Sequence, residues 1–451
     1  MQLLFLVPFL VSLYYVARKR VDKAFLNIYL PCIFLIPTYY TIRLPHLPAI
    51  SPGSGALIPI AISLLFRPKT KWRLRRMDLW VVLFMVSIGL SEVLRESDTH
   101  AGMLIWMEDF IEMFLAYIVG RQVIEPDLRL ETVKRIILLF VCQVPLALWE
   151  FRMGANLWLN FGNNVFDLNS GWHLQLRGGT SRIATCFAHP ILAGMLFVVA
   201  MAFNYYLVQI YKVNQTRLGR WMSQLQRYRV PFFVLAMLLY MTGSRMPMTC
   251  AVLAYLILQI PKFRNIRTGI IVVLLTATIG GSVVYGFFQK YTSTNDEQVD
   301  EAQSSAIYRK ELLINYAPTV EEGGWLGWGM DTFPRYPGQS SIDNDYLLLQ
   351  LAQGRLGEYS FLLLGFEALF TLGMYVGRFK SRESLFLVFS LMGAIISIFV
   401  GLSTVALFEQ VIQVLFLLLG WSQSLQETGP LGAQVMSALP EPKFRFKRVL
   451  A

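Results

Sequence analysis

The stretch from residue 230 to residue 260, VPFFVLAMLLYMTGSRMPMTCAVLAYLILQI, contains one charged side chain, Arg245. Gly243 and Pro247 stand on either side of it, and both residue types interrupt helices. The pattern predicts two apolar helices joined by a tight turn that presents a cation. Because an arginine at membrane depth is costly unless a partner, a cavity or an anionic ligand stabilises it, the function depends on what Arg245 contacts.

The whole chain has the composition of a membrane protein. Of its 451 residues, 55% are hydrophobic and 15% are charged, whereas soluble domains are about 25% charged. Apolar runs of roughly 15 to 25 residues recur along its length, as membrane spans require. We therefore expect an all-α polytopic fold, a single integral membrane domain over 1–451 with about 12–13 transmembrane helices. The expected spans are 2–17, 24–41, 53–66, 78–94, 102–120, 135–150, 183–209, 230–243, 246–260, 268–288, 345–376, 385–403 and 406–425.

Basic residues fall in every second connection between these spans. The basic segments are 18–23, 67–76, 121–135, 212–229, 262–267, 378–382 and the tail 427–451. The positive-inside rule places all of them in the cytoplasm. The net charge of +11 thus reflects orientation rather than nucleic-acid binding. The first span, 2–17, is expected to be an uncleaved anchor with its N-terminus outside.

Two long segments and one tight turn are then external. The long segments are 151–182 and 289–344, and the turn is 243–245. Each arm of the turn has about 15 residues, which reach roughly 23 Å at ~1.5 Å per residue. That is less than the ~30 Å hydrocarbon core. We therefore expect Arg245 to lie below the outer lipid surface, inside a cavity.

The first external segment supplies candidate anion ligands. Positive residues are under-represented on outer loops, so Arg177 and Arg182 suggest anion binding; the alternative for Arg182 is an interfacial arginine that snorkels to the surface. His189 follows, and Pro190 can kink the helix and free backbone groups. A structural, hydrogen-bonded histidine is the alternative reading of His189.

The second external segment supplies a candidate base. Asp343, Asn344 and Asp345 stand at the start of an apolar run, and a carboxylate there could take a proton from a sugar hydroxyl. A helix N-cap would explain one of the two aspartates. Arg309 is a weaker candidate in the same segment.

Two tryptophans in this segment have two readings. Trp325 and Trp328 lie in the glycine-rich stretch GGWLGWGMDTF, residues 323–333. They could stack on sugar faces or anchor the chain at the membrane interface. The stretch is not a nucleotide-binding loop, because no strand precedes it and no lysine follows.

Acidic residues inside the expected spans are also compatible with a transporter or flippase. Glu108, Asp109 and Glu112 lie in the span 102–120, and Glu358 interrupts a later one. They could pair with the external arginines, or form the proton path of a transporter or a flippase for lipid-linked oligosaccharides. The four cysteines lie singly in apolar segments and the histidines lack metal-ligand spacing, so neither a disulfide framework nor a metal site is expected.

Three segments together resemble the O-antigen ligase and polymerase family of bacterial envelope glycosyltransferases. They fall in this order over about 180–360. The first is Arg182 with Phe187-Ala188-His189-Pro190, and the second is Thr242-Gly243-Ser244-Arg245. The third consists of Gly327-Trp328-Gly329, Asp343-Asn344-Asp345-Tyr346-Leu347 and Gly354-Arg355-Leu356-Gly357.

The resemblance implies metal-independent glycosyl transfer without a cofactor at the periplasmic face of the bacterial inner membrane. The donor would be a glycan on undecaprenyl diphosphate, with Arg182 and Arg245 against the diphosphate. The acceptor would be a glycan or a lipid-linked sugar, with a chain-length regulator and a flippase as further partners. Where the family often has His-Asn, this chain has Asp343-Asn344, which makes Asp343 the base and favours polymerase over ligase.

Overall fold

The computed structural model describes residues 2–66, 73–95, 98–168, 171–213, 229–293, 301–339, 341–377 and 381–427. The basic segment 214–228 and nearly all of the tail 427–451 lie outside the described residues.

The described chain is mostly helical. Its helices are η1 (Gln2–Leu6), α1 (Val7–Ala17), α2 (Val21–Ala24), η2 (Phe25–Tyr29), α3 (Leu30–Leu35), α4 (Pro52–Phe66), α5 (Arg76–Arg95), α6 (Thr99–Asp109), η3 (Phe110–Leu115), α7 (Ala116–Val123), α8 (Pro126–Cys142), α9 (Val144–Met153), α10 (Leu157–Phe166), α11 (Pro190–Val213), α13 (Arg229–Met241), α14 (Arg245–Gln259), η4 (Ile260–Lys262), α15 (Ile266–Ser293), α16 (Glu301–Gly323), α17 (Asp345–Val376), α18 (Arg382–Gly401) and α19 (Gln410–Glu427). Its strands, β1 (Gln175–Arg177) and β2 (Thr180–Arg182), form one antiparallel hairpin.

The expected all-α membrane fold is confirmed. Six of the described helices are long and apolar enough to cross a bilayer, and shorter apolar helices accompany them, among them α4 and α13. The number of 12–13 spans stays a prediction, because several apolar segments form helices shorter than a full crossing. The expected span 24–41, for example, is helical only as far as Leu35.

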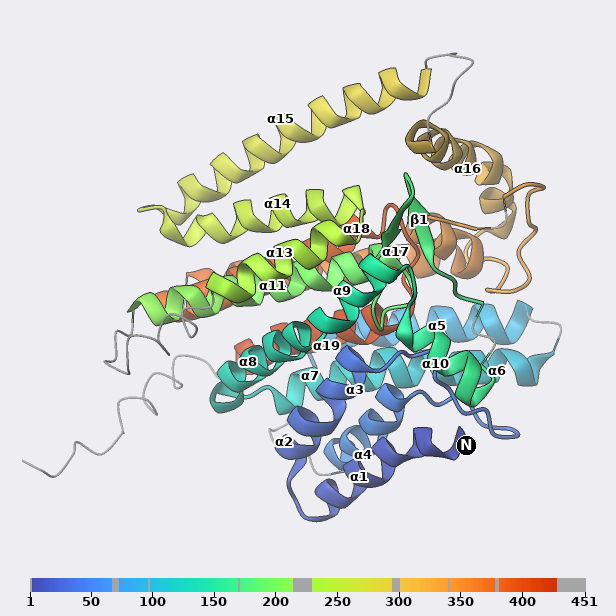
Figure 1. The fold of residues 1–451 in the computed structure, drawn as a ribbon, viewed down its shortest axis with the longest axis horizontal. Helices are drawn as coiled ribbons and strands as arrows, with labels where there is room; N and C mark the ends of the chain where they lie inside the picture. The colour runs from blue at the N-terminus through green and yellow to red at the C-terminus, as the bar shows by residue number, and fades with distance from the viewer. Residues whose placement is uncertain are drawn as a thin grey trace, which may run out of the picture.

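The two long external segments contain structure of their own. The segment 151–182 contains α10 and the β1–β2 hairpin, and the segment 289–344 contains α16. Figure 1 shows α16 and the hairpin at one end of the bundle of long helices, where the turn between α13 and α14 also lies. We call this the site end. Segments predicted to share one side of the membrane therefore meet in the fold.

Close helix contacts hold the bundle together. A Cβ atom at Gly120 in α7 would overlap the carbonyl of Leu417 in α19, and one at Gly420 would overlap the carbonyl of Tyr117. Such small-residue contacts let helix backbones approach in a membrane, where the hydrophobic effect between helices is weak. The pair α7–α19 therefore forms a rigid centre for the helices around it.

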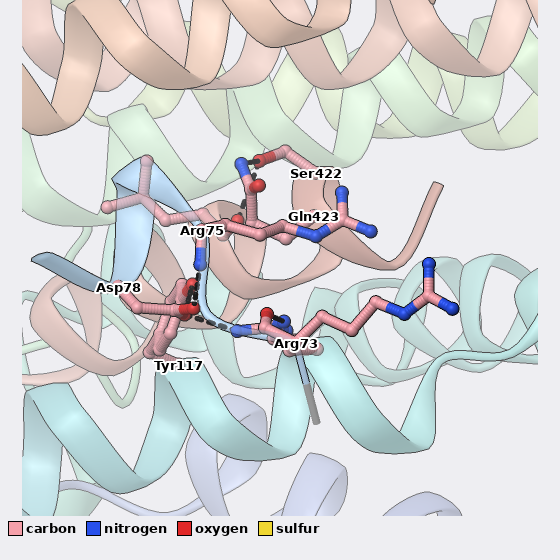
Figure 2. A network of polar contacts seen from close by, with 8 residues as sticks. Arg73, Arg75, Asp78, Tyr117, Ser422 and Gln423 are labelled. Atoms are coloured by element: carbon pink, nitrogen blue, oxygen red, sulfur yellow. Dashed lines mark hydrogen bonds and ion pairs between the residues drawn. The ribbon is translucent and has the colours of Figure 1, made fainter. Parts of the chain in front are cut away.

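A buried polar network lies at the opposite end. Arg121 and Asp78 form an ion pair, and both are buried. The Tyr117 hydroxyl also donates to Asp78, at 2.6 Å, and the Arg121 guanidinium donates to the carbonyl of Arg73 at 2.7 Å. In Figure 2 the guanidinium groups of Arg73 and Arg75 point away from the Asp78 carboxylate. Arg121 was expected in a basic cytoplasmic loop; it lies instead at the end of α7 with its charge paired inside the protein, and its side of the membrane stays a prediction.

Candidate active site

Arg182 holds the turn between α13 and α14. Two glycines with positive φ, Gly178 (54°) and Gly179 (75°), close the β1–β2 hairpin and turn the chain back so that Arg182 pairs with Gln175. The Arg182 Nε–H donates to the carbonyl of Thr242 at 3.0 Å, and an Nη donates to the Ser244 hydroxyl at 2.8 Å. The other Nη donates to the Gln175 side chain at 2.9 Å. Three of the five guanidinium N–H bonds therefore fix the hairpin and the turn to each other.

Arg177 reinforces the same turn. Its guanidinium donates to the carbonyl of Gly243 at 2.8 Å. Gly243 has φ of 59°, a left-handed conformation that glycine adopts readily. The backbone of 242–244 thus offers two carbonyls and a hydroxyl to two arginines from the preceding external segment.

Arg245 begins α14 directly after this turn, so the expected helical hairpin is present. Its side chain is exposed rather than enclosed. The sequence predicted an arginine inside a cavity; among the described residues, no hydrogen bond or ion pair of its guanidinium is found, in contrast to Arg182. The guanidinium of Arg245 is therefore available to a ligand.

His189 lies beside the arginines, just before α11. Its Nδ1 accepts a hydrogen bond from the backbone N–H of Ile191 at 3.1 Å. Burial, with the charge of Arg182 next in importance, lowers the pKa of His189 to about 4. The ring is then neutral at pH 7, and because Nδ1 accepts, the proton is on Nε2, which can donate to an anion.

Arg309 and Asp343 complete the cluster from the second external segment. Arg309 in α16 donates to the Ser305 hydroxyl at 3.2 Å, while its buried Nε has no hydrogen-bond partner in the described chain. Burial lowers the pKa of Arg309, and the nearby carboxylate of Asp343 opposes this while Arg177 adds to it. The Asp343 side chain is partly buried and accepts a hydrogen bond from the Ser341 hydroxyl at 2.6 Å. The carboxylate of Asp343 therefore lies near the guanidinium of Arg309.

The neighbours of Asp343 have structural roles. Asn344 is the N-cap of α17, with its side chain accepting from the backbone N–H of Tyr346 at 3.0 Å. The cap is thus the asparagine, not one of the aspartates. Asp345 is buried and accepts from the backbone N–H of Leu407 at 2.8 Å. It attaches the start of α17 to the connection between α18 and α19.

The glycine-rich stretch fills a break in α17. Gly354 has φ of 66° inside this helix. The N–H groups of Trp328 and Gly329 donate to the carbonyls of Leu351 and Ala352, at 2.8 and 2.9 Å. In return the backbone N–H of Arg355 donates to the carbonyl of Gly324 at 3.1 Å. The loop therefore satisfies backbone groups that the interrupted helix leaves unpaired.

The two tryptophans of this loop contact α16 and α17. The Trp328 indole N–H donates to the carbonyl of Thr319 at 2.9 Å. Trp325 is 61% exposed, and its ring meets Tyr359 edge to face. The structure does not join either indole to Arg182 or Asp343 by a hydrogen bond or ring contact among the described residues.

Sequence reasoning missed a buried carboxylate that supports the site. Glu150 accepts from the backbone N–H groups of Ala184 and Thr185, at 3.1 and 2.8 Å, and from the Asn156 amide at 2.8 Å. Thr185 has φ of 55°. Glu150 therefore fixes the unusual backbone between Arg182 and His189. It lies at the end of an apolar run, and no pattern in the sequence marks it.

Among the described residues, Glu108, Asp109 and Glu112 of the α6–η3–α7 helix form no salt bridge. Glu108 accepts from the backbone N–H of Ala49 at 2.6 Å, and Glu112 accepts from the Gln413 amide at 3.1 Å. In the described part of the chain, ion pairs between these carboxylates and Arg177, Arg182 or Arg245 are absent. The expected pairing with those arginines is therefore wrong.

One family model matches the chain. A model described as O-antigen ligase matches residues 230–357, which run from α13 through the Arg245 turn to the break of α17. Arg182 and His189 precede the matched range. No curated protein matches the chain. The match supports glycosyl transfer of the O-antigen ligase and polymerase type in general. The chain is therefore a multi-pass membrane protein whose residues 230–357 are similar to the O-antigen ligase family.

Proposed function

We propose that this protein polymerises repeat units of an O-antigen or exopolysaccharide at the periplasmic face of the bacterial inner membrane. The donor is an oligosaccharide on undecaprenyl diphosphate, and the acceptor is the hydroxyl of another glycan. The observation that carries the proposal is the grouping of four arginines and one carboxylate at the site end, within and beside the O-antigen ligase match.

The arginines suit a diphosphate leaving group. Arg245 is exposed at the outer start of α14, and Arg177 and Arg182 fix the turn that presents it. When the bond between the sugar C1 and the diphosphate oxygen breaks, negative charge develops on the diphosphate. Fixed guanidiniums stabilise that charge most in the transition state, which lowers the barrier.

Asp343 is the group that we assign to activation of the acceptor hydroxyl. As the acceptor oxygen forms its bond to C1, the hydroxyl proton passes to the Asp343 carboxylate. The charge of Arg309 acts on this carboxylate, and the neutral His189 can donate a hydrogen bond from Nε2 to the leaving phosphate. Arg182 is then a positioning residue that acts through Arg245.

The test uses purified protein and lipid-linked repeat units without a nucleotide sugar. We expect a ladder of lengthened products. Arg245→Ala and Asp343→Asn should each lower kcat/KM roughly 100-fold or more, because each removes a group that acts in the transition state. Arg335→Ala and Asp331→Asn, exposed residues of the same external segment, are the matched controls and should keep the activity.

The alternatives give different products. A single addition to supplied lipid A core would mean a ligase rather than a polymerase. Activity that survives Arg245→Ala and Asp343→Asn but not Glu112→Gln would favour the flippase or transporter class and overturn the assignment of the site.

A further inference from the structure

A cavity of about 520 Å³ adjoins Trp172, whose ring contacts His189, and the proposed reaction does not yet use it. We call it the Trp172 pocket. It is lined by aromatic, hydroxyl and carboxyl side chains, chiefly Tyr39, Thr41, Glu108, Glu112, Trp172 and Glu409. Its volume lies in the range of about 300–1,000 Å³ that small-molecule sites occupy.

Trp172 connects this pocket to the proposed reaction centre. Its ring meets His189 edge to face, with 6.4 Å between the ring centroids. Its indole N–H donates to Glu409 at 3.1 Å, and the other oxygen of Glu409 accepts from the Thr38 hydroxyl. The indole is therefore held between the pocket and His189. A molecule in the pocket would adjoin the place where the sugar is transferred.

Several polar groups on the wall are unused. In the described part of the chain, the hydroxyls of Tyr39 and Thr41 have no hydrogen-bond partner. One oxygen of Glu108 and one of Glu112 accept from the protein, and the second oxygen of each has no such partner. Sugar hydroxyls both donate and accept, while sugar C–H faces pack on aromatic rings. The wall thus offers both kinds of contact that a sugar makes.

The charge of the wall restricts the sugar. Four carboxyl groups line the pocket, those of Glu108, Glu112, Asp167 and Glu409, against one guanidinium, that of Arg43. An acidic sugar would bring a further carboxyl group against this acidic wall, whereas the hydroxyls of neutral sugars and amino sugars can form hydrogen bonds with its carboxyl groups.

We propose that the Trp172 pocket binds the terminal sugar of the acceptor glycan and selects a sugar without an acidic group. The role as acceptor site rests on the proposed function, because only a glycosyl transfer needs a second glycan beside the donor.

Binding is measured by saturation-transfer NMR on the full chain in nanodiscs, with methyl glucoside, methyl N-acetylglucosaminide and methyl glucuronide as probes. We expect the neutral glycosides to give at least about fivefold more transfer than the glucuronide, because of the carboxylates. Trp172→Ala should remove most of that signal, and Trp149→Ala, at an exposed tryptophan of α9, should keep it. Combined Glu108→Gln and Glu112→Gln should raise the glucuronide signal toward that of the neutral probes.

Equal transfer to all three probes, or transfer that Trp172→Ala leaves intact, overturns this proposal. The transfer assay on the same protein separates it from the proposed function. Trp172→Ala should raise the acceptor KM with kcat little changed. A product ladder without selective binding of the probes would overturn the assignment of the pocket and keep the proposed reaction. Selective binding without any product would overturn the proposed reaction and keep the pocket as a sugar-binding site.

Discussion

At the scale of single residues, Arg182 and Arg245 differ in what they contact. Arg182 is buried and donates to backbone and side-chain acceptors in two segments. Arg245 is exposed and makes no such contacts within the described chain. Both were expected to bind diphosphate directly. The structure instead suggests a division of labour, in which a buried guanidinium fixes the backbone from which an exposed one reaches a ligand.

His189 gives a prediction about pH. Its pKa is lowered from 6.5 to about 4 in the folded protein. Between these values the unfolded chain binds a proton that the folded chain does not, so stability is full above pH 6.5 and decreases as the pH falls toward 4. We expect the Tm measured in detergent to fall with decreasing pH across this window, and His189→Gln to weaken that fall.

The control for this measurement is His100→Gln, since His100 is exposed. The Tm of His100→Gln should depend on pH in the same way as the Tm of the unsubstituted protein. An identical pH dependence in His189→Gln and in the unsubstituted protein would show that His189 is not held neutral by the fold.

At the scale of elements, the contact between the glycine-rich loop and α17 is the least tolerant part of the site end. A Cβ atom at Gly327 would lie 2.5 Å from the carbonyl oxygen of Ala352 and from the backbone N of Gly354. Backbone atoms cannot move aside as a flexible side chain can, so the loop and the break in α17 fit only without a side chain at this position.

This contact gives a prediction with a matched control. Gly327 and Gly324 both have positive φ, 70° and 63°, but a Cβ at Gly324 would meet nothing within 4 Å. Gly327→Ala should therefore lose folded protein or activity, while Gly324→Ala pays only the left-handed backbone cost of roughly 1–2 kcal/mol. Yield of folded protein and Tm check this. Equal effects of the two substitutions would mean that the close approach does not matter.

At the scale of the whole molecule, the two ends of the bundle contain different kinds of polar cluster. The site end gathers segments far apart in sequence around the arginines, and the opposite end contains the buried pair of Asp78 and Arg121 (Figure 2). Removing one partner of a buried pair leaves an uncompensated charge, which typically costs about 3–5 kcal/mol.

The pair should therefore govern stability and not catalysis. We expect Asp78→Ala to lower Tm strongly, with kcat per folded molecule unchanged, and Arg121→Leu combined with Asp78→Leu to recover part of the loss. Glu131→Ala is the control, because its ion pair with Arg135 is long, at 3.7 Å, and solvent-exposed, so it contributes little. A Tm of Asp78→Ala like that of the control would contradict the structural role.

The sequence by itself determined the fold class and predicted that the candidate segments share one side of the membrane. Apolar runs of membrane length and basic residues in alternate loops report directly on the bilayer, and Gly243 with Pro247 marks the helical turn. These signals are local or depend only on charge and length. They also found Arg177, Arg182, His189, Arg309 and Asp343, which the fold gathers at one end.

Only the tertiary structure decided what each of these residues contacts. Nothing in the sequence states that Arg182 donates to Thr242, that Glu150 fixes the backbone at Thr185, or that Arg121 is buried against Asp78. Each of these contacts joins residues more than 30 positions apart, so it depends on how helices pack and not on any local pattern. Arg245 shows the difference best: the sequence marked it as a costly charge, and the packing around Arg182 decided which of the two arginines is left for a ligand.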